Sequence, residues 1–177
     1  METAIVSLIC IALIVLGGMT ISQSFLDSVD STSSGLEEMG DRAGEIMRTE
    51  LSPLSGSQSQ AEVLDIWLGN DGQTKLGSFD KWDVIVQYYD DGGSYHITWL
   101  PYTEEVPGDN KWTIAGIYLD VESSTPEVFE PDILNPGEDV AIEARLDPPV
   151  GAGTTNMVIV ATPNGIATVI PFAGYQP

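Results

Sequence analysis

The amino-terminal third of the chain is defined by a long run of uncharged residues. No charged side chain stands between Glu2 and Asp27, and the residues from Ala4 to Ile21 are apolar except for Ser7, Gly17, Gly18 and Thr20. As a helix, this span would be roughly 36 Å long, which exceeds the about 30 Å of bilayer hydrocarbon. The pattern therefore predicts a helix that is buried in lipid or against other helices.

Beyond Asp27 the apolar residues are spaced along a helix, with charged residues between them. They recur at intervals of seven and of three or four, at Val29, Leu36, Met39, Ala43 and Ile46. This spacing is typical of a heptad seam, and a helix continued to Leu51 would be roughly 70 Å long. Residues 1–51 are therefore predicted to form one helix that packs against partners outside its own fold.

We expect the contacts of this helix to be made by large apolar residues, a glycine pair and an amino-terminal acid. The predicted set is Glu2, Ile5, Leu8, Ile9, Leu13, Leu16, Gly17, Gly18, Phe25, Val29 and Leu36. Each glycine costs about 1 kcal/mol relative to alanine inside an exposed helix. Two interpretations of the pair remain open: glycine is common in membrane helices, or the pair allows close helix approach or a flexible joint. Glu2 needs a positive partner, such as the amino group of Met1, unless its place in the first helical turn is sufficient.

The rest of the chain has the pattern of β-strands. Residues 52–60, with the sequence SPLSGSQSQ, are predicted to be a linker that ends the helix at Pro53. Short segments rich in Val, Ile, Tyr and Trp follow, each bounded by turn residues. The predicted strands are Glu62–Leu68, Trp82–Tyr89, Tyr95–Leu100, Trp112–Leu119, Asp139–Leu146, Met157–Thr162 and Ile166–Phe172. Tight hairpin turns are expected at Asp90–Gly93 and at Asn164–Gly165.

These elements predict an α+β protein, with a long amino-terminal hydrophobic helix and an immunoglobulin-like antiparallel β-sandwich head over residues 61–177. The Cys-Trp-Cys arrangement of antibody domains is absent, because Cys10 is the only cysteine. Cys10 itself is expected to be a small apolar residue of the helix. We expect the four tryptophans to fill the core of the head: Trp67, Trp82, Trp99 and Trp112.

The chain is strongly acidic. Among its 177 residues, 27 are acidic and 6 are basic, which gives a formal net charge of -21. Nucleic acid is disfavoured as a partner, because phosphate binding requires Lys and Arg. An acidic surface keeps a protein hydrated and soluble. Cation binding is the alternative role for these acids, with Asp90-Asp91 and Glu104-Glu105 as the candidate Ca²⁺ ligands.

The sequence offers no catalytic arrangement. His96, the single histidine, lies in a predicted strand without a Cys or a second His at metal-ligand spacing, and it is expected to face solvent. The sequence contains no Gly-x-Ser-x-Gly turn, phosphate-binding loop, dinucleotide fingerprint or EF-hand loop. We therefore expect no enzyme activity, no cofactor and no dedicated metal site.

The amino terminus lacks the features of a cleaved secretory signal. The first basic residue is Arg42, and the heptad pattern continues past Gly17-Gly18 without a cleavage site. An uncleaved anchor would carry flanking positive charge, whereas this chain has Glu2. Two interpretations remain: an uncleaved anchor, or a mature chain whose short basic leader ended just before Met1. We favour the second.

The order of a hydrophobic helix, a heptad stem and a β-sandwich head resembles the type IV pilin superfamily, and most closely the archaellins, or archaeal flagellins. Two head segments are similar to archaellin heads and to their stator-associated relatives: WDVIVQYYDDGGSYHITWLPY over Trp82–Tyr102, and ILNPGEDVAIEARLDPP over Ile133–Pro149. The helix-first layout and the Asn135–Glu138 turn are the most specific features. One difference is that bacterial type IV pilins carry Glu at the fifth mature position, whereas Glu2 is at the second.

This resemblance implies a structural subunit that polymerises with copies of itself, through its helix, into an extracellular filament for motility or adhesion. It also implies a membrane-inserted precursor, a prepilin-type peptidase and a secretion and assembly ATPase. The alternative is a membrane-anchored β-sandwich binding module, such as a minor pilin or a stator-associated subunit that contacts the cell envelope. The heptad seam beyond the uncharged run favours the filament, because a tethered module does not need one.

Overall fold

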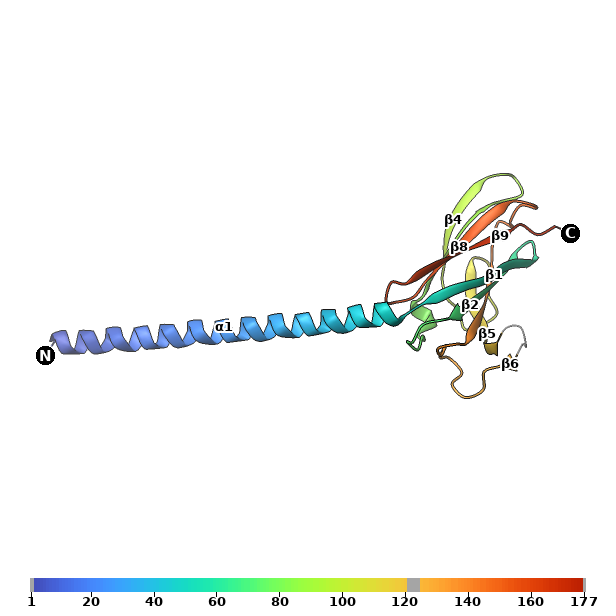
Figure 1. The fold of residues 1–177 in the computed structure, drawn as a ribbon. Coiled ribbons are helices and arrows are strands. Elements are labelled where there is room, and N and C mark those ends of the chain that lie inside the picture. Colours follow the sequence, from blue (N-terminus) through green and yellow to red (C-terminus); the bar gives the residue numbers. More distant parts are fainter. Residues whose placement is uncertain (1, 121–124, 177) are drawn as a thin grey trace. The chain divides into compact units, whose positions relative to one another are not determined.

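The computed structural model describes residues 2–120 and 125–176. The chain groups into two compact units, Met1–Gly44 and Glu45–Pro177. The first unit contains most of helix α1 (Glu2–Arg48), and the second contains two β-sheets that pack as a sandwich (Figure 1). The predicted fold class, a long apolar helix followed by an antiparallel β-sandwich, is confirmed.

Helix α1 is unbroken for 47 residues. The sequence has no proline before Pro53, so every backbone N–H beyond the first turn can donate within the helix. The helix ends at Arg48, shortly before the expected end, because a strand already begins at Leu51. Residues 45–50 belong to the head unit, in which the Gln73 N–H donates to the carbonyl oxygen of Arg48 at 2.7 Å.

The segment expected to be a linker is a strand, so that prediction is wrong. Strand β1 (Leu51–Gln60) pairs antiparallel with β2 (Val63–Asn70). Pro53 is tolerated because β1 lies at the edge of its sheet and its register with β2 shifts directly after this residue. A side chain at Gly56 would place its Cβ 2.9 Å from Ile170 Cγ2. The small residues that indicated a linker therefore allow β1 to pass close to another strand.

Two antiparallel sheets make up the described part of the head. The first has the strand order β1-β2-β7-β5-β6, and the second has the order β4-β3-β8-β9. A short 3-10 turn, η1 (Phe79–Lys81), precedes β3. The remaining strands are β3 (Asp83–Tyr89), β4 (Tyr95–Leu100), β5 (Lys111–Asp120), β6 (Thr125–Pro126), β7 (Asp139–Arg145), β8 (Thr155–Ala161) and β9 (Ala167–Ala173). All the predicted strands are present, and β1 and β6 are additional.

The core lies between the two sheets. Side chains alternate along each strand, so that Val84, Val86 and Tyr88 of β3 are buried while the residues between them point outward. Four other strands contribute in the same way, through Leu64, Ile66, Leu68, Val140, Ile142, Ala144, Val158, Val160, Ile170 and Phe172. Burying each large apolar side chain contributes about 1.5–3 kcal/mol. This burial is the main source of the head's stability.

Two of the four tryptophans fill the core as predicted. Trp112 has no exposed surface, and Trp82 is 2% exposed. The prediction is wrong for Trp99, which is 56% exposed, because the alternation along β4 turns it outward. Trp67 also takes an outward position and packs against Tyr118, with ring centroids 5.2 Å apart.

Both predicted hairpin turns are present. The Asp90–Gly93 turn joins β3 to β4, and the Asn164–Gly165 turn joins β8 to β9. Gly93 has a φ of 79° and Gly165 has a φ of 90°. Glycine adopts these left-handed angles without the steric cost of a Cβ atom, which explains its place in both turns.

The Asn135–Glu138 turn is fixed by polar groups that are mostly buried. The Glu138 carboxylate accepts the Asn135 N–H at 2.7 Å, and Gly137 has a φ of 84°. Asn70, which is fully buried at the end of β2, accepts the Gly137 N–H on its carbonyl oxygen at 2.7 Å. The turn that contributes to the archaellin resemblance therefore has a structural role, because it joins the start of β7 to the end of β2.

Candidate assembly surface

The large apolar side chains predicted to make the contacts of α1 are all exposed in the single chain. Their exposed fractions lie between 48% for Val29 and 71% for Leu8. The other apolar residues of the same stretch are also exposed: Val6, Ile11, Ile14, Val15, Met19, Ile21 and Leu26. A helix that is apolar on all sides is unfavourable in water. Helix α1 therefore needs an apolar environment that its own chain does not supply.

Polar side chains in the apolar part of α1 form hydrogen bonds within the helix. The hydroxyl of Ser7 donates to the carbonyl oxygen of Thr3 at 2.9 Å, and the hydroxyl of Thr20 donates to that of Gly17 at 2.9 Å. The Ser24 hydroxyl donates to the Thr20 carbonyl oxygen at 3.0 Å. Such bonds remove the cost of burying an unpaired hydroxyl. These three side chains can therefore enter lipid or a helix bundle.

The glycine pair leaves an open space on α1. Apart from the adjacent residues and the helix's own backbone, no atom lies within 4 Å of the position that a Cβ would occupy at Gly17 or at Gly18. A neighbouring helix can approach closely at such a place. Glu2, the remaining member of the predicted set, begins the helix with its backbone, and its side chain lies outside the described residues.

Helix α1 has the length and composition of a membrane span. In the part of the chain that the structure describes, it is the one helix that is long and apolar enough to cross a membrane. Its most apolar window contains no buried residue. The core helix of a soluble protein passes the same test but is mostly buried, so α1 differs from such a helix.

The stem, residues 27–48 of α1, keeps an apolar seam among charged residues. Val29 and Leu36, which are seven residues apart, are 48% and 66% exposed. Ala43 continues the same spacing and is also exposed. Between them stand Asp30, Glu37, Glu38, Asp41 and Arg42. The stem therefore has one apolar stripe, in contrast to the apolar surface on all sides that precedes Asp27.

His96 is partly buried, which corrects the expectation that it faces solvent. It takes an inward position on β4, and its ring stacks on Tyr88 with the centroids 5.2 Å apart. Its Nε2 donates to the Asp90 carboxylate at 2.8 Å, and the Ser94 N–H donates to the other oxygen of that carboxylate at 2.8 Å. The bond from His96, and then that from Ser94, holds the pKa of Asp90 below its usual value. This arrangement stabilises the β3–β4 hairpin.

Some acids of the head make ion pairs, and the described acids do not cluster into a metal centre. Among the described residues, no group of three or more His, Cys, Asp or Glu side chains is placed to hold a metal ion. Lys75 lies 2.6 Å from Glu130 and lowers the pKa of that carboxyl, and Arg145 lies 2.6 Å from Glu62. Because these basic side chains are already paired, acids dominate the charge of the remaining surface.

The head has an exposed apolar surface that was not identified from the sequence. We call it the outer apolar face, formed by Tyr89, Tyr95, Ile97, Trp99, Met157 and Val169. The alternation of large apolar residues along β4 is visible in the sequence. However, the alternate positions hold His96, Thr98 and Leu100, so the pattern does not reveal which face of the strand meets the core.

Comparison with solved structures finds proteins of similar fold. The archaeal flagellum of Methanospirillum hungatei strain JF1 matches over 96% of this chain and 93% of that chain, with a TM-score of 0.56 and 12% identity. The archaellum periplasmic stator protein FlaG from Sulfolobus acidocaldarius matches over 70% of this chain and 99% of that chain, with a TM-score of 0.51 and 19% identity. The archaellum periplasmic stator protein complex FlaF and FlaG from the same organism matches over 70% of this chain and 89% of that chain, with a TM-score of 0.52 and 18% identity. The sequence itself matches no protein-family model and no curated protein.

The chain has the archaellin fold. The structural likeness confirms, at the level of fold, the resemblance that the sequence indicates. Residues 45–177 make up 133 of the 177 residues, so a match over 96% of the chain must include α1 as well as the head. Similar folds are found in an archaeal flagellum and in an archaellum stator protein.

Proposed function

We propose that this protein is the subunit of an archaellum-like filament that assembles at the cell surface by packing α1 of many copies together. The observation that carries this proposal is the exposure of α1. Its apolar residues are exposed on all sides, in a chain that shares the archaellin fold over both helix and head. A helix of this kind is suited to the centre of a bundle, where every face has a neighbour.

The membrane is the environment of α1 before assembly. Helices of many copies then exchange lipid contacts for contacts with one another, which are favoured by close packing and small residues such as Gly17 and Gly18. Each copy contacts its neighbours through different surfaces, and contacts of this kind that do not close into a ring produce an open helical polymer. The predicted contact residues of α1, from Ile5 to Leu36, are the residues that would be buried in the filament.

The helix and the head contribute to the free energy of assembly with opposite signs. Each large aliphatic residue of α1 that leaves water contributes about 1.5–3 kcal/mol. The acidic heads repel one another, since each chain carries a net charge of -21. Heads that cover the outside of a filament keep it hydrated, and salt screens their repulsion over about 10 Å at 0.1 M.

The proposal includes a route to the surface. A prepilin-type peptidase would remove a basic leader, and an assembly ATPase would extract the chain from the membrane. The protein itself acts as a structural component and not as an enzyme. Its proposed use is motility or adhesion.

A stator-associated module anchored in the membrane is the second candidate function. The match to FlaG favours it, because that match covers 99% of the stator chain. In this case α1 would remain in the membrane, and the head would contact the envelope.

The test is to shear the surface of cells that produce this protein, collect the released fibres, and image them by electron microscopy. Mass spectrometry of the fibres should identify this chain as their main component. Recovery of the chain in the membrane fraction, with fibres made of another protein, would support the stator-associated module and contradict the filament.

A further inference from the structure

The outer apolar face is continuous across one whole sheet of the head. Its six large side chains are between 41% and 64% exposed. They stand on the outward positions of β4, β3, β8 and β9, which are neighbours in that order. The strand register joins them into rows, one of which runs through Trp99, Ile85, Ile159 and Val169. The face is therefore a single surface on the side of the sheet that does not meet the core.

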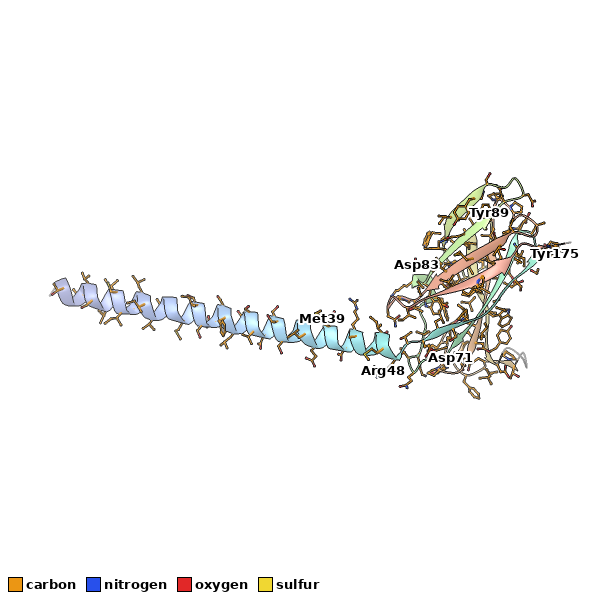
Figure 2. All side chains as sticks on the ribbon, turned by 45° about the horizontal axis from the view of Figure 1, so that its top comes forward. Met39, Arg48, Asp71, Asp83, Tyr89 and Tyr175 are labelled. Carbon is orange, nitrogen blue, oxygen red and sulfur yellow. The ribbon has the colours of Figure 1, made fainter. Side chains whose placement is uncertain are left out.

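This face differs from the other sheet of the head in its charge. Asp83 is the one charged residue among the outward positions of its four strands, and it stands with Tyr89 at the two ends of β3 (Figure 2). The outward positions of the other sheet hold a larger set of charged residues, namely Asp65, Lys111, Asp139, Glu143 and Arg145. In a chain with a net charge of -21, the outer apolar face is thus a nearly uncharged area.

Two polar side chains of this face, Trp99 and Tyr95, have hydrogen-bond partners within it. The Trp99 indole N–H donates to the Asp83 carboxylate at 2.8 Å, and the Tyr95 hydroxyl donates to the side-chain oxygen of Gln87 at 2.8 Å. The rings of Tyr89 and Tyr95 pack with their centroids 5.0 Å apart. Covering the face would therefore leave these two donors paired, which avoids the cost of burying them without partners.

The area of the face fits a protein partner. A half-exposed large side chain offers roughly 100 Å² for burial, so the six together offer on the order of 600 Å². The largest apolar patch on a typical monomer measures about 300–600 Å² and is often functional. A standard interface buries about 800 Å² on each partner. The outer apolar face thus supplies most of the area that a stable pair needs.

We propose that the outer apolar face binds the same face of a second copy, so that two heads pair about a two-fold axis. Two copies of so acidic a chain repel each other over most of their surface, and they can approach closely where charge is nearly absent. A basic partner would gain more by binding the acidic surface elsewhere. Flat sheet faces also stack well on one another, at a spacing of about 10 Å.

This pairing is independent of the proposed function. A two-fold contact joins two copies and then stops, so it does not propagate a filament. Head pairing would instead join two heads wherever copies are close together, in the membrane or between filaments that lie side by side. It can therefore be tested without fibres.

The experiment uses the full chain in a non-ionic detergent whose micelles greatly outnumber the chains, so that detergent covers α1. Sedimentation analysis gives the number of chains per complex at low and at high salt. Wild type should form dimers, and the dimer should strengthen with salt, because screening weakens the repulsion between the heads while the face itself is nearly uncharged. A contact held by opposite charges would weaken instead, and this result would overturn the proposal.

Two acidic substitutions separate the face from the rest of the head. Ile97→Asp places like charges across the two-fold contact and should raise the dimer dissociation constant about 100-fold or more. Val106→Asp introduces the same charge at a loop residue outside the face, which is 88% exposed, and should leave the constant unchanged. Thermal unfolding of both variants checks that the head remains folded, and Ile97→Val should pair like wild type.

A third variant separates head pairing from helix packing. Leu13→Asp disrupts the contact surface of α1 and should leave head pairing in detergent unchanged, so a dimer lost in this variant would mean that the helix holds it together. A short bifunctional maleimide should link two copies that carry Ile97→Cys in a Cys10→Ser background, and it should not link copies with Val106→Cys. A single chain per complex at every salt concentration, or equal linking at both positions, would overturn the proposal whether or not the protein forms filaments.

Discussion

Helix α1 and the head differ in where their apolar side chains are buried. In the head, residues such as Ile142 and Trp112 are almost completely enclosed by their own chain. In α1, the most apolar window has no buried residue at all. The head therefore carries its own source of stability, whereas the helix depends on lipid or on other copies. The stability that α1 gains from other copies therefore increases with the concentration of those copies.

The largest expected effect is the loss of assembly when a charge is placed on α1. Leu13→Asp would place an unpaired carboxylate among packed helices, which costs several kcal/mol in every copy. Electron microscopy should show no filaments, while thermal unfolding of the head should match that of wild type. Val106→Asp adds the same charge on the head and should assemble normally. Filaments that tolerate Leu13→Asp but dissociate in high salt would mean that the heads hold the polymer together.

The next largest effect concerns the start of the head. A chain that begins at Glu45 keeps β1 and should be soluble, rich in β-structure and cooperative in unfolding. A chain that begins at Ala61 lacks β1, which exposes the edge of β2 and uncovers Ile170 beside Gly56. This shorter chain should unfold at markedly lower denaturant concentration or fail to fold. Equal stability of the two chains, measured by circular dichroism in urea, would show that β1 is dispensable.

Elements that are determined by their own local sequence could be predicted, whereas elements that depend on tertiary contacts could not. Strands β3 and β4 could be placed from their composition and from the Asp90–Gly93 turn, because glycine marks the left-handed turn position. Strand β1 could not, because its serines and its proline are typical of linkers. What makes it a strand is the pairing with β2 and the close approach to β9, and both are tertiary contacts.

The candidate surfaces follow the same rule. The apolar run of α1 is visible in the sequence because it places apolar residues on every side of the helix, so no choice of face is involved. The outer apolar face is not, because Trp99 and Leu100 are both large and apolar while only Leu100 meets the core. Which of two apolar faces a strand buries depends on its neighbours, and the local pattern does not contain that information.

A smaller effect is expected from replacing the glycine pair. The way this effect depends on the size of the new side chain separates close helix approach from a flexible joint. If helices approach closely at Gly17-Gly18, replacing both with alanine should weaken assembly slightly and replacing both with leucine should weaken it strongly. If the pair is a flexible joint, both changes should act alike, because alanine and leucine each stabilise a helix by about 1 kcal/mol relative to glycine. The critical concentration for assembly is the measurement. A normal value for the double leucine variant would contradict both roles.

The smallest expected effect lies within the head, at the carboxylate of Asp90. The bonds from His96 and Ser94 hold its pKa below the usual value of 3.8, so the folded state favours the ionised form. A depressed pKa in the folded state stabilises the protein fully above that usual value, and the contribution is lost as the pH falls through the folded-state pKa. Asp90→Asn should therefore lower the urea midpoint at neutral pH, and its difference from wild type should diminish well below pH 3.8. Asp91→Asn removes a charge from the same turn without removing the bond to His96, and it should leave the midpoint nearly unchanged. A difference for Asp90→Asn that persists undiminished in acid would mean that the hairpin is not held by this carboxylate.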